Sequence, residues 1–143
     1  MSQQLRNITK PTLGDTAATG LLHGIAAGVA MLAFLISADL LLGNAQAVGR
    51  LAAVPFPAAP LADLFIHLGV AAVYGVLWGA AWRWLRYGCA LPNWLLGFAY
   101  GILLFVLAQS LEPTLPAAFQ QASSGLLLTA HSIYGLVLGG LSR

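Results

Sequence analysis

Four long apolar stretches carry small residues spaced four apart, and this pattern constrains the chain more than any other feature of its sequence. In a bilayer no hydrophobic force drives one helix onto another, and glycines four apart form a flat strip that a neighbouring helix can approach closely. The pattern therefore predicts helices that pack by close backbone contact. The glycines at this spacing are Gly20, Gly24 and Gly28; Gly75 and Gly79; Gly97 and Gly101; Gly135 and Gly139.

The composition indicates that the solvent of this chain is lipid. Of the 143 residues, 59% are hydrophobic and only 7% are charged, and the mean hydropathy is +0.85. Such a chain has too little polar surface to cover a water-soluble globule. Most of its length lies in the apolar stretches, so we expect one integral membrane domain over residues 1–143.

The apolar stretches are long enough to cross a membrane, since a hydrocarbon core of roughly 30 Å takes about 20 helical residues. We expect an all-α fold, a four-helix transmembrane bundle, with spans at about 17–42, 61–85, 93–110 and 124–141. Pro60 suits the first position of the second helix, because proline needs no hydrogen-bond partner for its nitrogen there.

The two halves of the chain resemble each other. The segment from Gly24 to Gly28 corresponds to 97–101, and the segment from Tyr74 to Gly79 corresponds to 134–139. This similarity predicts a duplicated two-helix hairpin with both copies in the same orientation. The alternative is that the likeness reflects only the frequency of glycine in membrane helices.

Basic residues predict the orientation of the bundle, because lysine and arginine in short loops stay on the cytoplasmic side. Of the six lysine and arginine residues, only Arg50 is expected on the side opposite the termini. We therefore predict a protein of the bacterial cytoplasmic (inner) membrane with both termini in the cytoplasm. The net charge of +2 then reflects orientation, and we expect no nucleic-acid partner. The basic residues on the cytoplasmic side are Arg6, Lys10, Arg83, Arg86 and Arg143.

Aromatic residues gather around the second loop, where rings with a polar edge favour the headgroup layer. We expect all of them at the membrane surface. They are Trp78, Trp82, Trp84, Tyr87 and Trp94.

Three histidines are the residues best suited to chemistry, because an ionisable group inside a membrane is costly and suggests a function. His67 and His131 lie at similar depths in the second and fourth spans, so they can face each other. His23 lies near the opposite surface. Asp63, one turn before His67, can orient its imidazole, and Tyr74 continues the same helix face.

Two interpretations of the histidines are open. In the first, His67, His131, Asp63 and Tyr74 form a cofactor site: two imidazoles hold a haem b, or one of them bonds a quinone. In the second, each imidazole hydrogen-bonds a neighbouring helix and serves only packing. The sequence has no nucleotide-binding, zinc or protease motif, so we predict no catalytic residue and no metal site.

The absence of such motifs favours a non-catalytic accessory or structural subunit of a larger membrane complex. Its expected partners are other membrane protein subunits and membrane lipids, including bound lipid. One alternative is an electron-transfer subunit that uses haem b or quinone at His67 and His131. A further alternative is transport of small solutes or ions, although transport requires polar residues at mid-span and these spans are apolar there.

The last span carries a histidine followed by a tyrosine and two glycines: His131, Tyr134, Gly135 and Gly139. In this pattern and in its four-span layout, the chain resembles small bacterial inner-membrane proteins known only as domains of unknown function. The resemblance implies a helical membrane fold and implies no activity.

Overall fold

The structure is a computed structural model that describes residues 12–41, 60–88, 90–111 and 124–142, apart from the side chains of residues 39 and 60–63. Within these ranges the chain forms four helices and no strand: α1 (Leu13–Leu41), α3 (Pro60–Gly88), α4 (Asn93–Leu111) and α5 (Ser124–Leu141). Each is long and apolar enough to cross a membrane. The predicted all-α four-helix bundle is confirmed.

The helix bounds follow local capping signals. α1 begins at Leu13, before the predicted residue 17, because Thr12 and Asp15 cap it. The Asp15 amide donates to Oγ1 of Thr12 at 3.1 Å, and the Thr12 amide donates to the Asp15 carboxylate at 2.8 Å. This reciprocal pair satisfies two amides that have no partner within the helix. α3 begins at Pro60, as predicted, and continues to Gly88.

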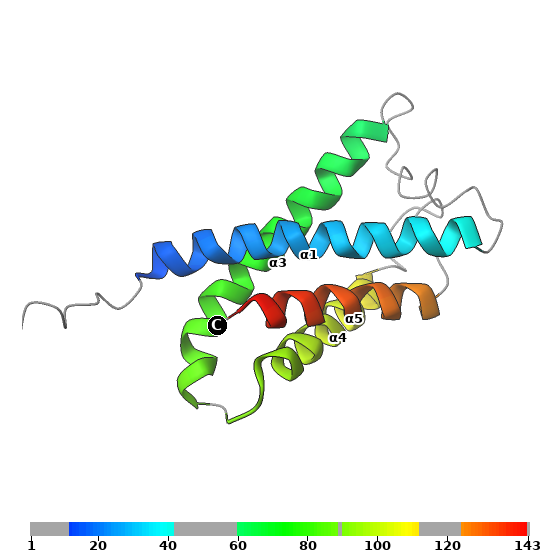
Figure 1. Cartoon of the computed structure of the whole chain (residues 1–143). Coiled ribbons are helices and arrows are strands. Elements are labelled where there is room, and N and C mark those ends of the chain that lie inside the picture. Colours follow the sequence, from blue (N-terminus) through cyan, green and yellow to red (C-terminus); the bar gives the residue numbers. More distant parts are fainter. Residues whose placement is uncertain (1–11, 42–59, 89, 112–123, 143) are drawn as a thin grey trace, which may run out of the picture.

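The first two helices cross where glycine backbones meet (Figure 1). A Cβ placed on Gly75 would lie 2.5 Å from the Cα of Gly24, and one placed on Gly24 would lie 2.7 Å from the Cα of Gly75. One turn away, a Cβ on Gly79 would overlap the carbonyl oxygen of Thr16. Only glycine permits this approach, because real Cβ atoms do not come so close to backbone.

The second pair, α4 and α5, repeats this contact. A Cβ on Gly97 would lie 2.6 Å from the Cα of Gly139, and one on Gly135 would lie 2.9 Å from the Cα of Gly101. The predicted pairing of two glycine-packed hairpins is therefore present in the structure.

The correspondence between the two hairpins is one turn away from the predicted one. Gly97 contacts Gly135 and Gly139. The residue of α1 that makes the equivalent contacts, with Gly75 and Gly79, is Gly20 and not Gly24. The prediction was wrong here because α1 has three glycines at the same spacing, and the spacing alone does not select two of them. Gly28, the third, meets the Cβ of Ala71.

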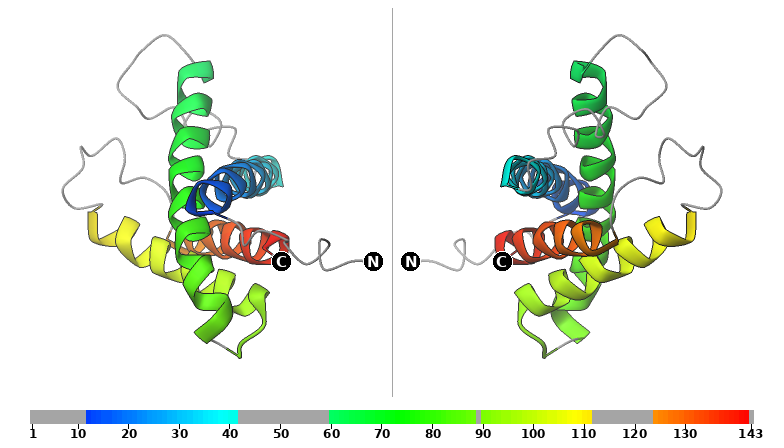
Figure 2. Two further views of the ribbon diagram at one scale, coloured as in Figure 1. Left: turned by 90° about the vertical axis from the view of Figure 1, so that its left-hand side faces the viewer. Right: turned by 90° about the vertical axis from the view of Figure 1, so that its right-hand side faces the viewer.

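Aromatic side chains join the two hairpins. The Tyr134 hydroxyl of α5 donates to the Ala71 carbonyl of α3 at 2.7 Å, and the Tyr100 hydroxyl of α4 donates to the Tyr74 carbonyl at 2.9 Å. Tyr134 is 2% exposed. α5 also packs against α1, and the two helices lie side by side in both views of Figure 2.

The tryptophans divide between the interior of the bundle and its surface. Trp78 and Trp82 are 2% and 8% exposed and stack at 5.6 Å between ring centroids. Trp84, Tyr87 and Trp94 are exposed, as a surface position requires. The helical period separates the two groups, because residues 78 and 82 share the α3 face that meets the bundle.

The first half of α3 extends beyond the other helices (Figures 1 and 2). Phe65, Val70 and Val73 are exposed there, and a Cβ on Gly69 would meet no atom within 4 Å. This part of α3 therefore presents an apolar face that no described residue covers.

We predict that Gly75→Ala lowers the free energy of unfolding by about 1–3 kcal/mol, because the added methyl collides with the α1 backbone. Gly69→Ala is the matched control on the same helix, and it should leave stability unchanged or slightly higher. Thermal or denaturant unfolding in detergent measures both. Equal stability of the two variants would contradict the glycine contact.

Candidate functional site

The two predicted histidines line one cavity of about 220 Å³ inside the bundle. His67 enters it from α3 and His131 from α5. The wall is mainly apolar, and one side of the cavity is open. The other lining residues are Met31, Val70, Ala71, Tyr74, Leu104 and Tyr134.

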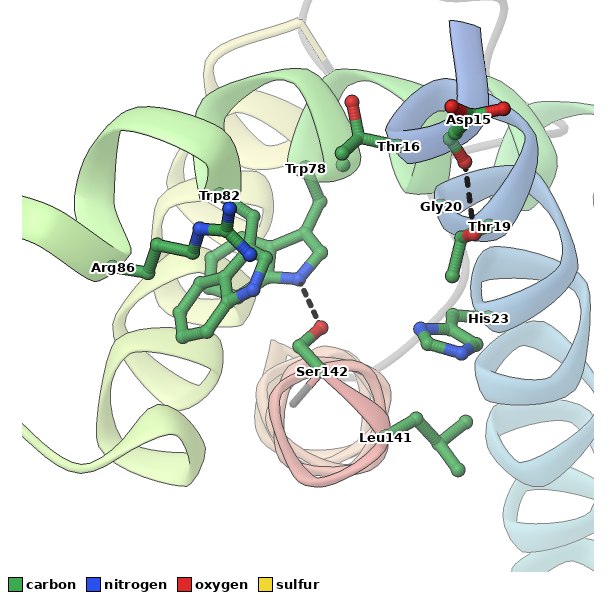
Figure 3. Close-up of a pocket in the computed structure, with 11 residues that line it drawn as sticks. Asp15, Thr16, Thr19, Gly20, His23, Trp78, Trp82, Arg86, Leu141 and Ser142 are labelled. Carbon is green, nitrogen blue, oxygen red and sulfur yellow. Dashed lines mark hydrogen bonds between the residues drawn. The ribbon is translucent and has the colours of Figure 1, made fainter. Parts of the chain in front are cut away.

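Three of the four residues predicted for the cofactor site therefore come together: His67, His131 and Tyr74. The orienting role predicted for Asp63 concerns a side chain outside the described part of the chain. His23 lies apart from this cavity, as predicted, and lines a second pocket (Figure 3).

Each imidazole is held by a backbone carbonyl. His67 Nε2 donates to the Gly28 carbonyl of α1 at 3.3 Å, and His131 Nδ1 donates to the Leu127 carbonyl of its own helix at 2.8 Å. A carbonyl oxygen only accepts hydrogen bonds, so these nitrogens carry the protons. In a neutral imidazole the other ring nitrogen, Nδ1 of His67 and Nε2 of His131, is a hydrogen-bond acceptor.

The packing interpretation holds in part. The bond from His67 to Gly28 joins α3 to α1, whereas the bond from His131 stays within α5. His131 also meets the ring of Phe105 edge-on, with 6.2 Å between centroids. Helix packing therefore uses one nitrogen of His67, and one nitrogen of each ring has no hydrogen bond to a described residue.

The two tyrosines of the cavity differ in their hydroxyl groups. The Tyr134 hydroxyl is committed to the Ala71 carbonyl. The Tyr74 hydroxyl makes no hydrogen bond to any described residue, although its backbone carbonyl accepts one from Tyr100. Tyr74 can therefore donate to a ligand or accept from it.

The size of the cavity limits what it can hold. At about 220 Å³ it is smaller than the roughly 300–1,000 Å³ of pockets that enclose drug-sized ligands, and a haem is larger than most such ligands. A single six-membered ring with its oxygen atoms is better matched to this volume. Among the described residues, no three His, Cys, Asp or Glu side chains come together as metal ligands.

Sequence reasoning missed three residues of this wall: Met31, Leu104 and Tyr134. Tyr134 had a usable signal, since it follows His131 by three residues and shares its helix face. Met31 and Leu104 had none, because they are ordinary apolar residues in apolar helices and only the packing of α1 and α4 brings them here.

Comparisons of the chain with protein-family models, with curated proteins and with solved structures give no match.

Removal of the buried hydroxyl in Tyr134→Phe should lower the free energy of unfolding by about 1 kcal/mol, because the hydrogen bond from α5 to the Ala71 carbonyl is lost. Tyr74→Phe should leave stability unchanged, since that hydroxyl bonds no described residue. Unfolding in detergent compares the two variants. A larger loss in Tyr74→Phe would show that the cavity is closed by bonds other than these.

Proposed function

We propose that this protein is a non-catalytic membrane subunit whose histidine cavity binds the ring of a quinol on behalf of a larger assembly. The observation that carries the proposal is the meeting of His67, His131 and Tyr74 around one small cavity. Together with Tyr134, whose hydroxyl is bonded to the Ala71 carbonyl, these are the polar side chains that α3 and α5 direct into otherwise apolar walls.

The hydrogen-bond pattern favours the reduced ring. Both histidines offer acceptor nitrogens, since their protons are engaged by the carbonyls of Gly28 and Leu127. A quinol has two hydroxyl groups that donate, whereas a quinone has two carbonyls that only accept. The two histidine acceptors favour the form that can donate to them, because their buried lone pairs otherwise lack partners.

The exposed face of α3 supports the second half of the proposal, the larger assembly. A hollow of about 420 Å³ lies around Gly69, with Ile66, Val70, Val73 and Tyr74 beside it. The helix contacts within each hairpin, α1 with α3 and α4 with α5, use glycine for close backbone approach. A helix from another subunit would fit the hollow and would lie next to the bound ring, because Val70 and Tyr74 line both spaces.

Binding of decylubiquinol and decylubiquinone to the purified protein tests the ligand. We expect the quinol to bind about tenfold more tightly than the quinone, and His131→Leu and His67→Leu to weaken quinol binding by about tenfold each. His23→Leu is the matched control, since His23 does not line this cavity. Native mass spectrometry in detergent measures bound ligand and the folded protein together.

Equal quinol binding by wild type and His131→Leu would refute the site. An absorption spectrum gives an independent result. A Soret band that disappears in His67→Ala and His131→Ala would identify haem, and not a quinol, as the ligand of this cavity.

The assembly is tested separately by gentle purification from the native membrane. We expect the chain to leave the membrane with larger partners, and Gly69→Leu to release it by filling the hollow on α3. If the chain leaves its native membrane in mild detergent as an isolated species of 14.9 kDa, with no larger partner, this part of the proposal is contradicted.

A further inference from the structure

A second pocket, of about 270 Å³, lies at the end of the bundle where α1 begins and where α3 and α5 end (Figure 3). α3 contributes Trp78, Trp82 and Arg86 to its wall. Leu141 at the end of α5 and Ser142 directly after it also line the pocket. Helix ends of a membrane bundle lie near the boundary between hydrocarbon and water. The pocket is therefore at the depth of the lipid headgroups. The residues from α1 are Asp15, Thr16, Thr19, Gly20 and His23.

The α3 wall is a row of N–H donors at four-residue spacing. The first, Nε1 of Trp78, donates to Oγ of Ser142 at 2.7 Å. Nε1 of Trp82 and Nε of Arg86 are buried and have no hydrogen-bond partner among the described residues. Trp82 is only 8% exposed. An unsatisfied buried donor is destabilising, so two of them one turn apart in a pocket indicate a missing acceptor.

We propose that this pocket binds a phosphate group, with two of its oxygens accepting from Trp82 and Arg86. The charge of Arg86 favours an anion, and two donors from successive turns suit a ligand with several acceptor oxygens. This site is distinct from the histidine cavity and does not depend on the function proposed for it.

The acidic residue of the pocket does not oppose this assignment. Figure 3 shows Asp15 on the α1 side, away from Trp82 and Arg86 on the α3 side. Its carboxylate accepts from both the amide and the hydroxyl of Thr12, each at 2.8 Å, as the cap of α1. Its lone pairs are therefore partly satisfied, and the two buried donors without a partner among the described residues, Nε1 of Trp82 and Nε of Arg86, belong to the opposite wall.

Two sources can supply such a phosphate: the headgroup of a membrane phospholipid and a soluble phosphate compound. The first test compares phosphatidylglycerol with diacylglycerol of the same acyl chains, by native mass spectrometry of the whole chain in detergent. We expect phosphatidylglycerol to bind at least about tenfold more tightly than diacylglycerol. Arg86→Gln and Trp82→Phe should each remove about tenfold of that preference.

Neighbouring residues of the same types provide matched controls. Arg83→Gln and Trp84→Phe also remove one cation and one indole from this end of α3, but neither residue lines the pocket. Both should keep the wild-type preference. Because Trp82 is buried, a thermal unfolding curve accompanies each variant, and the partly exposed Arg86 carries the test if Trp82→Phe does not fold.

Competition with inorganic phosphate separates the two sources. If phosphatidylglycerol stays bound in millimolar phosphate, the ligand of the pocket is a lipid headgroup. If phosphate displaces the lipid from the wild type but not from Arg86→Gln, the ligand is a soluble phosphate compound. Equal binding of phosphatidylglycerol and diacylglycerol, or equal loss in Arg83→Gln and Arg86→Gln, would overturn the proposal and leave water as the partner of these donors.

Discussion

The close contact between glycine backbones is the interaction on which the rest of this structure depends. In lipid, helices gain nothing by removing apolar side chains from the surrounding solvent. How closely two helix backbones can approach therefore decides which faces meet. Gly75 against Gly24, and Gly135 against Gly101, set the register of each hairpin. That register also places the Gly28 carbonyl within reach of His67, so the packing of the first hairpin orients a residue of the candidate site.

The hairpins meet through hydrogen bonds and aromatic rings rather than through glycine. Tyr134, Tyr100 and Trp78 each reach from one hairpin to the other and find an acceptor there. Such bonds are directional, and bulky rings leave spaces between the helices that they join. Both the histidine cavity and the second pocket lie along this joint, since each is lined by α1, α3 and α5. The proposed ligands therefore occupy the less tightly packed of the two kinds of interface.

Much of this arrangement could be predicted before the structure. The helices, their order and the use of glycine in pairs follow from residue types and spacing, because span length and backbone approach are local properties. The convergence of His67 and His131 followed from their similar depth. The donor row of Trp82 and Arg86 did not follow from the sequence, because nearly every face of α3 is apolar and only packing decides which side chains of that segment turn into the bundle. The earlier start of α1 was also readable, from the Thr12 and Asp15 cap.

The sequence by itself determined four apolar helices, their glycine strips and the residues with chemistry to offer. Only the tertiary structure decided which of three glycines in α1 meets Gly75, which tryptophans are buried and which polar atoms are left without partners. The physical reason is that nearly every face of these helices is apolar, so hydropathy does not fix how each helix is rotated. Rotation is set by close packing between helices, and the contents of both pockets follow from it.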